Sequence, residues 1–221
     1  MDIIYYDDNI IVAVKPAGVI STDDPGGMPT LLREALGRDD ADIRTVHRLD
    51  QVVSGLMVFA QTPAAASELS RQIRMGEFKK TYLAVVHGVP QERRGRMEDI
   101  LLRSKEQRKT FVVNKPCRGS QEAVLEYRLL GSNGEMSMVE INLITGRTHQ
   151  IRASMADLGH PLLGDGKYGV GSVNRKYGET HQALYSYRLR FDFPTDAGIL
   201  EYLRGREFQV DEVPFQKKYF S

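Results

Sequence analysis

Short apolar stretches rich in β-branched and aromatic residues recur along this chain of 221 residues and constrain its fold most strongly. Stretches of this kind predict β-strands. We expect strands at residues 3–6, 10–15, 55–61, 81–88, 111–114, 123–129, 136–143 and 184–193. Helix signals are fewer and do not alternate regularly with the strands, which argues against a doubly wound parallel sheet. The sequence therefore predicts an α+β fold with a mixed, largely antiparallel central sheet flanked by helices and loops.

Three segments carry helix signals. A helix over 63–75 begins with a proline, whose fixed backbone angle suits the first helical turn. A second helix, over 30–36, is expected to be capped by Thr30 and ended by Gly37. A third is predicted over 147–158, where apolar residues are spaced by three and four.

Composition favours a cytoplasmic protein. The lone Cys117 excludes an internal disulfide and a thiolate metal site. The first residues are acidic and lack the basic and long apolar segments of a signal peptide. Apolar runs such as 10–14 are far shorter than the roughly 20 residues that span a bilayer. The length fits a single domain over residues 1–221.

The net charge of +1 conceals an uneven distribution. Residues 1–50 carry ten acidic and five basic side chains, so the remaining residues carry a net charge of +6. Between residues 91 and 118 the basic side chains are Arg93, Arg94, Arg96, Arg103, Lys105, Arg108, Lys109, Lys115 and Arg118. A local basic stripe is typical of nucleic-acid binding, although a charge run is most often a solvated face.

The segment His47-Arg48-Leu49-Asp50 places an imidazole, a guanidinium and a carboxylate just before a predicted buried strand. Such groups are costly to desolvate, so they usually lie at the mouth of a cleft. A polar loop with one surface ion pair is the alternative. A second polar cluster, Thr145 to Arg152, favours the functional interpretation.

Asp50 is a candidate nucleophile. A nucleophilic carboxylate must stay ionised while water is excluded from it, and burial alone would raise its pKa. A guanidinium that binds it in bidentate fashion opposes this effect and fixes its direction. An arginine from residues 147–152 is the candidate partner.

Other motifs receive structural interpretations. The glycine-rich segment 164–169 matches the dinucleotide pattern, but no βαβ unit surrounds it and residues 170–174 are not expected to open a helix. Its glycines are expected to permit a tight turn. The five histidines show no metal-ligand spacing. Arg71 and Arg74 either hold phosphates or lie on a solvated face. Tyr82, within an apolar strand, would by default be a core tyrosine.

Five segments, in order along the chain, resemble motifs of the RluA-type pseudouridine synthases, which isomerise uridine to pseudouridine in RNA. The segments are Lys15-Pro16-Ala17-Gly18; His47 to Asp50 with Ser54-Gly55-Leu56; Lys80 to Gly88; Thr145 to Arg152 with residues 158–165 and 168–169; and residues 181–184 with Arg188-Leu189. One such segment could arise by chance, whereas five in sequence make the resemblance specific.

The resemblance implies the pseudouridine synthase fold, no metal and no cofactor. It implies that Asp50 acts at the glycosidic centre, that Tyr82 packs against the uracil and removes the proton from carbon 5, and that Arg152 pairs with Asp50. It also implies that Arg48 holds or replaces a nucleotide flipped out of the RNA stack. Further RNA contacts are expected from His47, Arg147, His149, Lys80, Arg93, Arg94 and Arg96.

Two features depart from the family pattern. Val53 stands where relatives commonly have serine or threonine, which removes a hydroxyl near Asp50. The first motif begins at Lys15, which leaves no room before it for the small RNA-binding domain of many relatives. The catalytic domain itself is then expected to select the substrate, a stem-loop of transfer RNA, ribosomal RNA or both. We expect a monomer with no membrane partner.

Two alternatives remain open. The first is a non-catalytic RNA-binding protein or RNA-folding chaperone on the same fold, although binding alone would not require Asp50, Tyr82 and Arg152 together. The second is a hydrolase with Asp50 as nucleophile and His47 or His149 as base. The sequence shows no oxyanion-hole or metal motif for a hydrolase.

Overall fold

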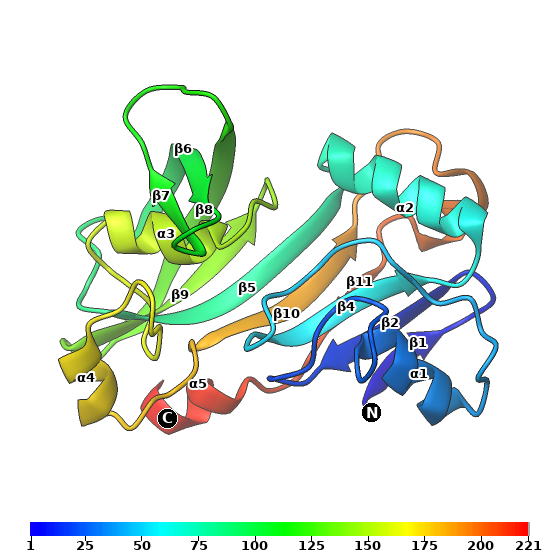
Figure 1. Cartoon of the computed structure of the whole chain (residues 1–221), viewed down its shortest axis with the longest axis horizontal. Coiled ribbons are helices and arrows are strands. Elements are labelled where there is room, and N and C mark those ends of the chain that lie inside the picture. The colour runs from blue at the N-terminus through cyan, green and yellow to red at the C-terminus, as the bar shows by residue number, and fades with distance from the viewer. Residues whose placement is uncertain (221) are drawn as a thin grey trace. The chain divides into compact units, whose positions relative to one another are not determined.

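The computed structural model describes residues 1–220, which form two compact units (Figure 1). The first unit comprises Met1–Lys80 and Ser186–Asp211. The second comprises Thr81–Tyr185 and the C-terminal residues from Glu212 onward. This division does not test the single domain predicted over 1–221, which stays a prediction.

In the first unit, strands follow one another in the hydrogen-bonded order β1-β2-β4-β10, with β3 paired to β4 and β11 paired to β10. The pairings of β1 with β2, β2 with β4, β3 with β4 and β10 with β11 are antiparallel. The elements of this unit are β1 (Ile3–Tyr6), β2 (Ile10–Lys15), α1 (Met28–Leu36), β3 (Arg44–Thr45), β4 (Ser54–Ala60), α2 (Pro63–Met75), most of β10 (Leu184–Phe191), the 3₁₀ helix η1 (Gly198–Leu203) and β11 (Glu207–Gln209).

In the second unit, the strand order is β5-β9-β8-β6-β7. The pairings of β6 with β7, β6 with β8 and β8 with β9 are antiparallel. The elements are most of β5 (Phe78–His87), β6 (Arg94–Ser104), β7 (Lys109–Val112), β8 (Ser120–Ser132), β9 (Met136–Leu143), α3 (Gln150–Asp157), α4 (Gly171–Lys176) and α5 (Pro214–Phe220).

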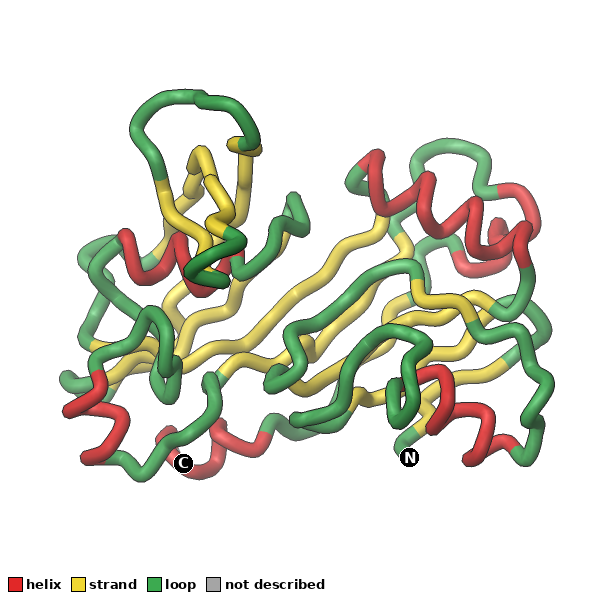
Figure 2. The backbone as a smooth tube through the Cα atoms, in the orientation of Figure 1, coloured by secondary structure: helices red, strands yellow, loops and turns green. Residues whose placement is uncertain are grey.

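Strands form the centre of each unit, and the helices lie at its margins (Figure 2). The predicted α+β class with a mixed, largely antiparallel sheet is confirmed. Among the helices of residues 1–220, none is both long and apolar enough to cross a bilayer.

Each unit has its own apolar core, because alternate strand residues face inward. In the first unit, strand residues such as Val12 and Val58 pack with Leu69 of α2 and Phe191 of β10. In the second, one cluster is built on Val85, Met136, Leu163 and Ala183, and another on Leu101, Ala123 and Ala153. The apolar runs of the sequence therefore predict where the cores form.

The helix predicted over 63–75 is confirmed as α2. Thr62 lies at its N-terminus, where the hydroxyl accepts a hydrogen bond from Ala65 N–H at 3.1 Å. Gly76 ends the helix in the left-handed conformation, with φ of 71°.

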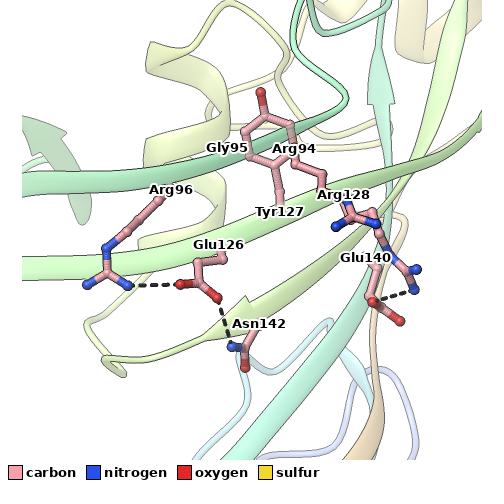
Figure 3. A pocket seen from close by; sticks show the side chains of 8 residues that line it. All are labelled: Arg94, Gly95, Arg96, Glu126, Tyr127, Arg128, Glu140 and Asn142. Atoms are coloured by element: carbon pink, nitrogen blue, oxygen red, sulfur yellow. Dashed lines mark hydrogen bonds and ion pairs between the residues drawn. The ribbon is translucent and has the colours of Figure 1, made fainter.

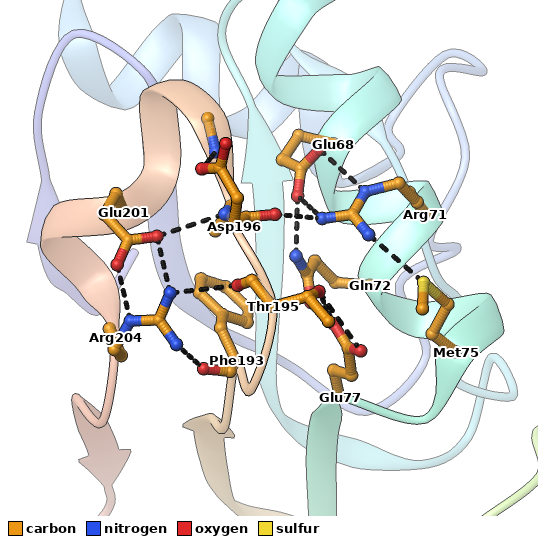
Figure 4. A network of polar contacts seen from close by, with 12 residues as sticks. Glu68, Arg71, Gln72, Met75, Glu77, Phe193, Thr195, Asp196, Glu201 and Arg204 are labelled. Atoms are coloured by element: carbon orange, nitrogen blue, oxygen red, sulfur yellow. Dashed lines mark hydrogen bonds and ion pairs between the residues drawn. The ribbon is translucent and has the colours of Figure 1, made fainter.

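A polar network joins α2 to the segment that leads into η1 (Figure 4). Arg71 binds the Glu68 carboxylate and the Asp196 carbonyl. Arg204 binds Glu201 and the carbonyls of Phe193 and Thr195. The Arg71 guanidinium is therefore committed to contacts within the protein, which favours the solvated-face interpretation over phosphate binding.

The other two predicted helices begin elsewhere. Thr30 lies inside α1 and does not cap it. The residue at the cap is Gly27, where a Cβ atom would lie 2.0 Å from the Thr22 carbonyl oxygen. The helix predicted from residue 147 begins at Gln150. The Gln150 side chain accepts a hydrogen bond from the Arg147 N–H at 3.0 Å. Residues 147–149 therefore form a turn, and the helix begins only after it.

Strand β6 lies within the basic segment and was not predicted. Its side chains alternate between exposed and partly buried positions, and most of the exposed ones are charged. A strand with so few buried apolar residues gives no apolar signal in the sequence.

The glycine-rich segment 164–169 forms a turn, as predicted. A Cβ atom at Gly164 would lie 1.9 Å from the His181 carbonyl oxygen, and one at Gly169 would lie 2.4 Å from the Asp165 carbonyl oxygen. The expectation that no helix follows is wrong, because α4 begins at Gly171. That helix has only six residues, too few to supply the long helix of a dinucleotide site.

Candidate active site

In the first unit, residues 47–53 form the turn between β3 and β4, here called the Asp50 turn. His47 and Leu49 are buried, with 9% and 8% of their surfaces exposed. Arg48 is exposed and Asp50 is partly exposed. His47 and Leu49 therefore anchor the segment, while Arg48 and Asp50 lie at its more accessible positions.

Three hydrogen bonds hold the buried residues of this turn. The Ser21 hydroxyl donates to the Leu49 carbonyl at 2.9 Å and accepts the Leu49 N–H at 3.0 Å. His47 Nε2 accepts the Val58 N–H at 3.0 Å. The turn itself closes through Val53 N–H, which donates to the Asp50 carbonyl at 3.0 Å. Because these partners are backbone groups or a small hydroxyl, they fix the main chain on either side of Asp50.

Two residues assigned to RNA contacts are buried instead. Burial and the charge of Lys80 lower the pKa of His47 to about 3, so this imidazole is neutral and serves as an acceptor in the core. Lys80 is 7% exposed, and burial lowers its pKa to about 8. Their positions do not favour the RNA contacts predicted for them, because neither side chain is at the surface.

In the second unit, Arg152 on α3 forms a buried ion pair with Asp165. Arg152 Nε and Nη2 lie 2.7 Å and 2.9 Å from the two carboxylate oxygens, and the residues are 4% and 0% exposed. Burial would raise the pKa of Asp165, but hydrogen bonds from Arg152 and from the N–H groups of Lys167 and Tyr168 hold it below its usual value. The pair fixes the plane of the guanidinium.

Asp50 and Arg152 belong to different units, so the ion pair predicted between them stays a prediction. Tyr82 lies on β5 and is 5% exposed, as expected for a tyrosine in an apolar strand. The catalytic roles of these three residues likewise stay predictions. Asp165 is the partner that the sequence did not single out, although it stands in the motif that follows Arg152.

Tyr168 links Arg152 to the hairpin of β6 and β7. Its hydroxyl accepts the Thr110 N–H at 2.7 Å and lies 2.9 Å from His149 Nδ1. Its ring lies 4.9 Å from Lys109 Nζ and 5.1 Å from the Arg152 guanidinium carbon. His149, predicted to contact RNA, is therefore engaged through Nδ1 in a contact within the protein.

Figure 3 shows the outer face of β6, β8 and β9, which forms an open groove of about 550 Å³. Arg96 Nε lies 2.7 Å from Glu98 Oε1, and Arg96 Nη1 lies 2.8 Å from Glu126 Oε1. Arg128 Nη2 lies 2.9 Å from Glu140 Oε1. Acidic side chains therefore balance much of the basic charge that the sequence concentrates here.

The remaining predicted RNA contacts are exposed. They are Arg48, Arg93, Arg94 and Arg147, of which Arg147 donates through Nε to the Glu122 carbonyl at 2.9 Å. Exposed arginines are suited to phosphate contacts. Among the described residues, no group of three or more His, Cys, Asp or Glu side chains is arranged to hold a metal ion.

Comparison with known proteins identifies similar chains. Residues 9–157 match the family described as RNA pseudouridylate synthase. The chain is 32% identical over its whole length to "Uncharacterized RNA pseudouridine synthase YhcT" of Bacillus subtilis, and the match spans 73% of that protein.

Two further similarities extend this result. The chain is 38% identical, over 76% of its length and 82% of the relative's, to "Dual-specificity RNA pseudouridine synthase RluA" of Yersinia pestis. The structure of human RNA pseudouridylate synthase domain containing 1 superposes with a TM-score of 0.78 at 25% identity, over 96% of this chain and 83% of that one.

Proposed function

The chain belongs to the RNA pseudouridylate synthase family, and on that basis we propose that it isomerises specific uridines of structured RNA to pseudouridine with Asp50 as the catalytic carboxylate. The observation that supports this role is the way the Asp50 turn is held. Its main chain is held by Ser21 and Val58, whereas the Asp50 side chain remains partly exposed within the family's motif. A carboxylate on a fixed main chain is suited to act on a bound nucleotide.

The reaction breaks the bond between C1′ and N1 of the uracil and forms a bond between C1′ and C5. The C5 proton leaves and N1 gains a proton, so the product has the same atoms as the substrate. An isomerase of this kind needs a group that acts at the glycosidic centre and a base that removes the C5 proton. We assign the first role to Asp50 and the second to Tyr82.

Arg152 and Arg48 complete the proposal. The Arg152 guanidinium, oriented by Asp165, would pair with Asp50 and fix the direction of its carboxylate. Arg48, exposed beside Asp50, would fill the space left in the RNA stack when the target nucleotide is flipped out.

The proposed substrates are stem-loops of transfer RNA, ribosomal RNA or both. The Yersinia pestis relative is named a dual-specificity synthase, which supports the proposal of more than one RNA substrate. Action as a monomer in the cytoplasm is part of the same proposal.

The test is tritium release from RNA labelled at C5 of uridine. Transfer RNA and ribosomal RNA would be prepared separately from cells that lack this protein. Asp50→Asn should abolish release while RNA affinity stays nearly unchanged. Asp42→Asn is the matched control, because Asp42 is an exposed carboxylate on the segment that precedes β3, outside the Asp50 turn, and it pairs with Arg44.

Residual turnover of Asp50→Asn within about tenfold of wild type, a barrier change of only ~1.4 kcal/mol, would exclude the nucleophile role. No release by the wild-type protein from either RNA, with RNA affinity retained, would favour the non-catalytic RNA-binding alternative.

A further inference from the structure

Lys15, the last residue of β2, carries a fully buried ammonium group. The residue is 0% exposed and is among the largest side chains buried to this degree. Lysine at such a position is rare, because removing its charge from water is costly. An apolar side chain of the same size would fill the space without that cost, so the charge itself requires an explanation.

The ammonium has three hydrogen-bond acceptors, which match its three N–H donors. Lys15 Nζ lies 2.9 Å from the Pro16 carbonyl, 2.6 Å from the Val19 carbonyl and 2.8 Å from the Gln51 carbonyl. Two acceptors belong to the loop 16–19 and the third belongs to the Asp50 turn. The ammonium therefore connects two segments that lie far apart in the sequence.

Gln51 adds two bonds to the same connection. Its carbonyl accepts the Gly18 N–H at 2.8 Å, and its side-chain Nε2 donates to the Gly18 carbonyl at 2.9 Å. Gly18 has φ of 88°, a conformation that L-residues with a Cβ atom rarely adopt. The loop 16–19 is thus shaped to present its carbonyls to Lys15 while it binds the residue that follows Asp50.

We propose that Lys15 is a positioning residue: its ammonium fixes the Gln51 carbonyl and thereby the direction of the Asp50 side chain, and this support weakens when the ammonium loses its proton. The proposal rests on the proposed function of Asp50. Its structural half, the support of the Asp50 turn by a charged lysine, can be measured without RNA.

Titration of this lysine falls within an accessible pH range. Burial lowers the pKa of Lys15 to about 8, and the negative charge of Asp50 partly opposes the fall. Asp50, on the turn, is the charged group that acts on the ammonium, and the groups contributed by the loop 16–19 are neutral carbonyls. A neutral amine attracts carbonyl dipoles less strongly than an ammonium does, so the connection should loosen as pH rises through this value.

The first experiment measures tritium release by wild type, Lys15→Met and Lys15→Arg between pH 6 and pH 10. Wild-type kcat should fall on the alkaline side with an apparent pKa of about 8. Lys15→Met should lower kcat by about tenfold to a hundredfold, as expected for a misplaced catalytic group, with little change in KM for RNA. Lys15→Arg, which keeps its charge, should recover part of kcat and lose the alkaline fall.

Lys79→Met is the matched control. Lys79 also donates to a backbone carbonyl, that of Gly76 at 2.6 Å, but it makes no contact with the Asp50 turn. Its kcat and pH profile should follow wild type. An alkaline fall of the same midpoint in Lys15→Met or Lys15→Arg would assign that fall to another group and overturn the proposal.

The second experiment measures amide hydrogen exchange, corrected for its intrinsic pH dependence. Peptides from 16–19 and 50–53 should lose protection in Lys15→Met at pH 7 and in wild type above pH 8, whereas α2 should not. Unchanged protection would overturn the proposal. If Lys15→Met fails to fold, the wild-type pH series decides alone. Loss of protection in an inactive wild-type protein would refute the proposed function and leave the support of the turn established.

Discussion

The Asp50 turn and the Arg152 region each contain a buried cation, and they stabilise it in different ways. Lys15 is surrounded by three backbone carbonyls, whereas Arg152 faces the fully buried carboxylate of Asp165. The three groups that accept hydrogen bonds from Lys15 are neutral, so they do not cancel the positive charge of the ammonium. The carboxylate of Asp165, by contrast, neutralises the charge of the Arg152 guanidinium. Burial therefore lowers the lysine pKa towards neutrality but leaves the arginine pair ionised, so the Asp50 turn should respond to alkali and the Arg152 region to acid.

The largest expected effect comes from breaking the ion pair. Asp165→Asn would take from the Arg152 guanidinium the carboxylate that binds it in bidentate fashion, and loss of one partner of a buried pair costs about 3–5 kcal/mol of stability. Urea unfolding at pH 7 measures this loss. Glu212→Gln is the control, because Glu212 and its partner Lys217 are 66% and 72% exposed and such pairs contribute about 0–1 kcal/mol. Equal losses in the two variants would contradict the contrast between buried and exposed pairs.

A smaller effect is expected from a neutral contact of the Asp50 turn. Ser21→Ala would leave the N–H and the carbonyl of Leu49 without the hydroxyl that binds both, at a cost of about 1–3 kcal/mol. Activity should fall with stability, because the main chain beside Asp50 loosens. Ser104→Ala, which removes an exposed hydroxyl bound to Gln107 N–H, should change neither. Normal unfolding and tritium release by Ser21→Ala would show that this hydroxyl does not hold the turn.

The buried ammonium of Lys15 also makes the free energy of unfolding depend on pH. The pKa of Lys15 is about 8 in the folded protein and 10.5 in the unfolded chain. Between these two pH values the unfolded chain binds more protons than the folded protein, so the free energy of unfolding should rise with pH. Wild type should therefore gain stability relative to Lys15→Met from pH 8 to pH 10.5, even as its activity falls. A relative loss over this range, in parallel urea titrations, would reverse the expected sign.

Asp165 gives the opposite sign. Its folded pKa lies below the ordinary value of 3.8, so its contribution is fully present above that pH and is lost as pH falls through the folded value. Unfolding of wild type and Asp165→Asn should accordingly converge only in strong acid. Convergence near neutral pH would contradict the buried ion pair.

The smallest effects concern exposed cations. Replacing Arg93 and Arg94 with glutamine should weaken RNA binding and reduce the dependence of log K on log salt by about 0.7–0.9 for each RNA phosphate that the variant no longer neutralises. Arg96→Gln should have less effect, because Glu98 and Glu126 already balance that guanidinium. Filter binding between 50 and 200 mM salt, about the range over which such contacts are resolved, measures both. An equal change in slope for Arg96→Gln would mean that RNA displaces its carboxylate partners.

Local signals predicted much of the fold. The strands at Ile10–Lys15 and Met136–Leu143 and the helix at Pro63–Met75 match their predicted ranges, because apolar content and a helix-opening proline act within one element. Strand β6 was missed because charges occupy its exposed positions. The start of α3 is three residues later than predicted, because the Gln150 side chain accepts a hydrogen bond from the Arg147 N–H and holds residues 147–149 in a turn.

Sequence patterns are sufficient to predict the α+β class, the apolar cores and, through the ordered motifs, the family to which the chain belongs. Folding determines which charges are buried and what compensates them. Lys15 binds a carbonyl 36 residues away, Arg152 a carboxylate 13 residues away, and the charge of Lys80 acts on the buried His47 imidazole. Periodicity encodes which face of an element is apolar, but the partner of a buried charge depends on segments that meet only when the chain has folded.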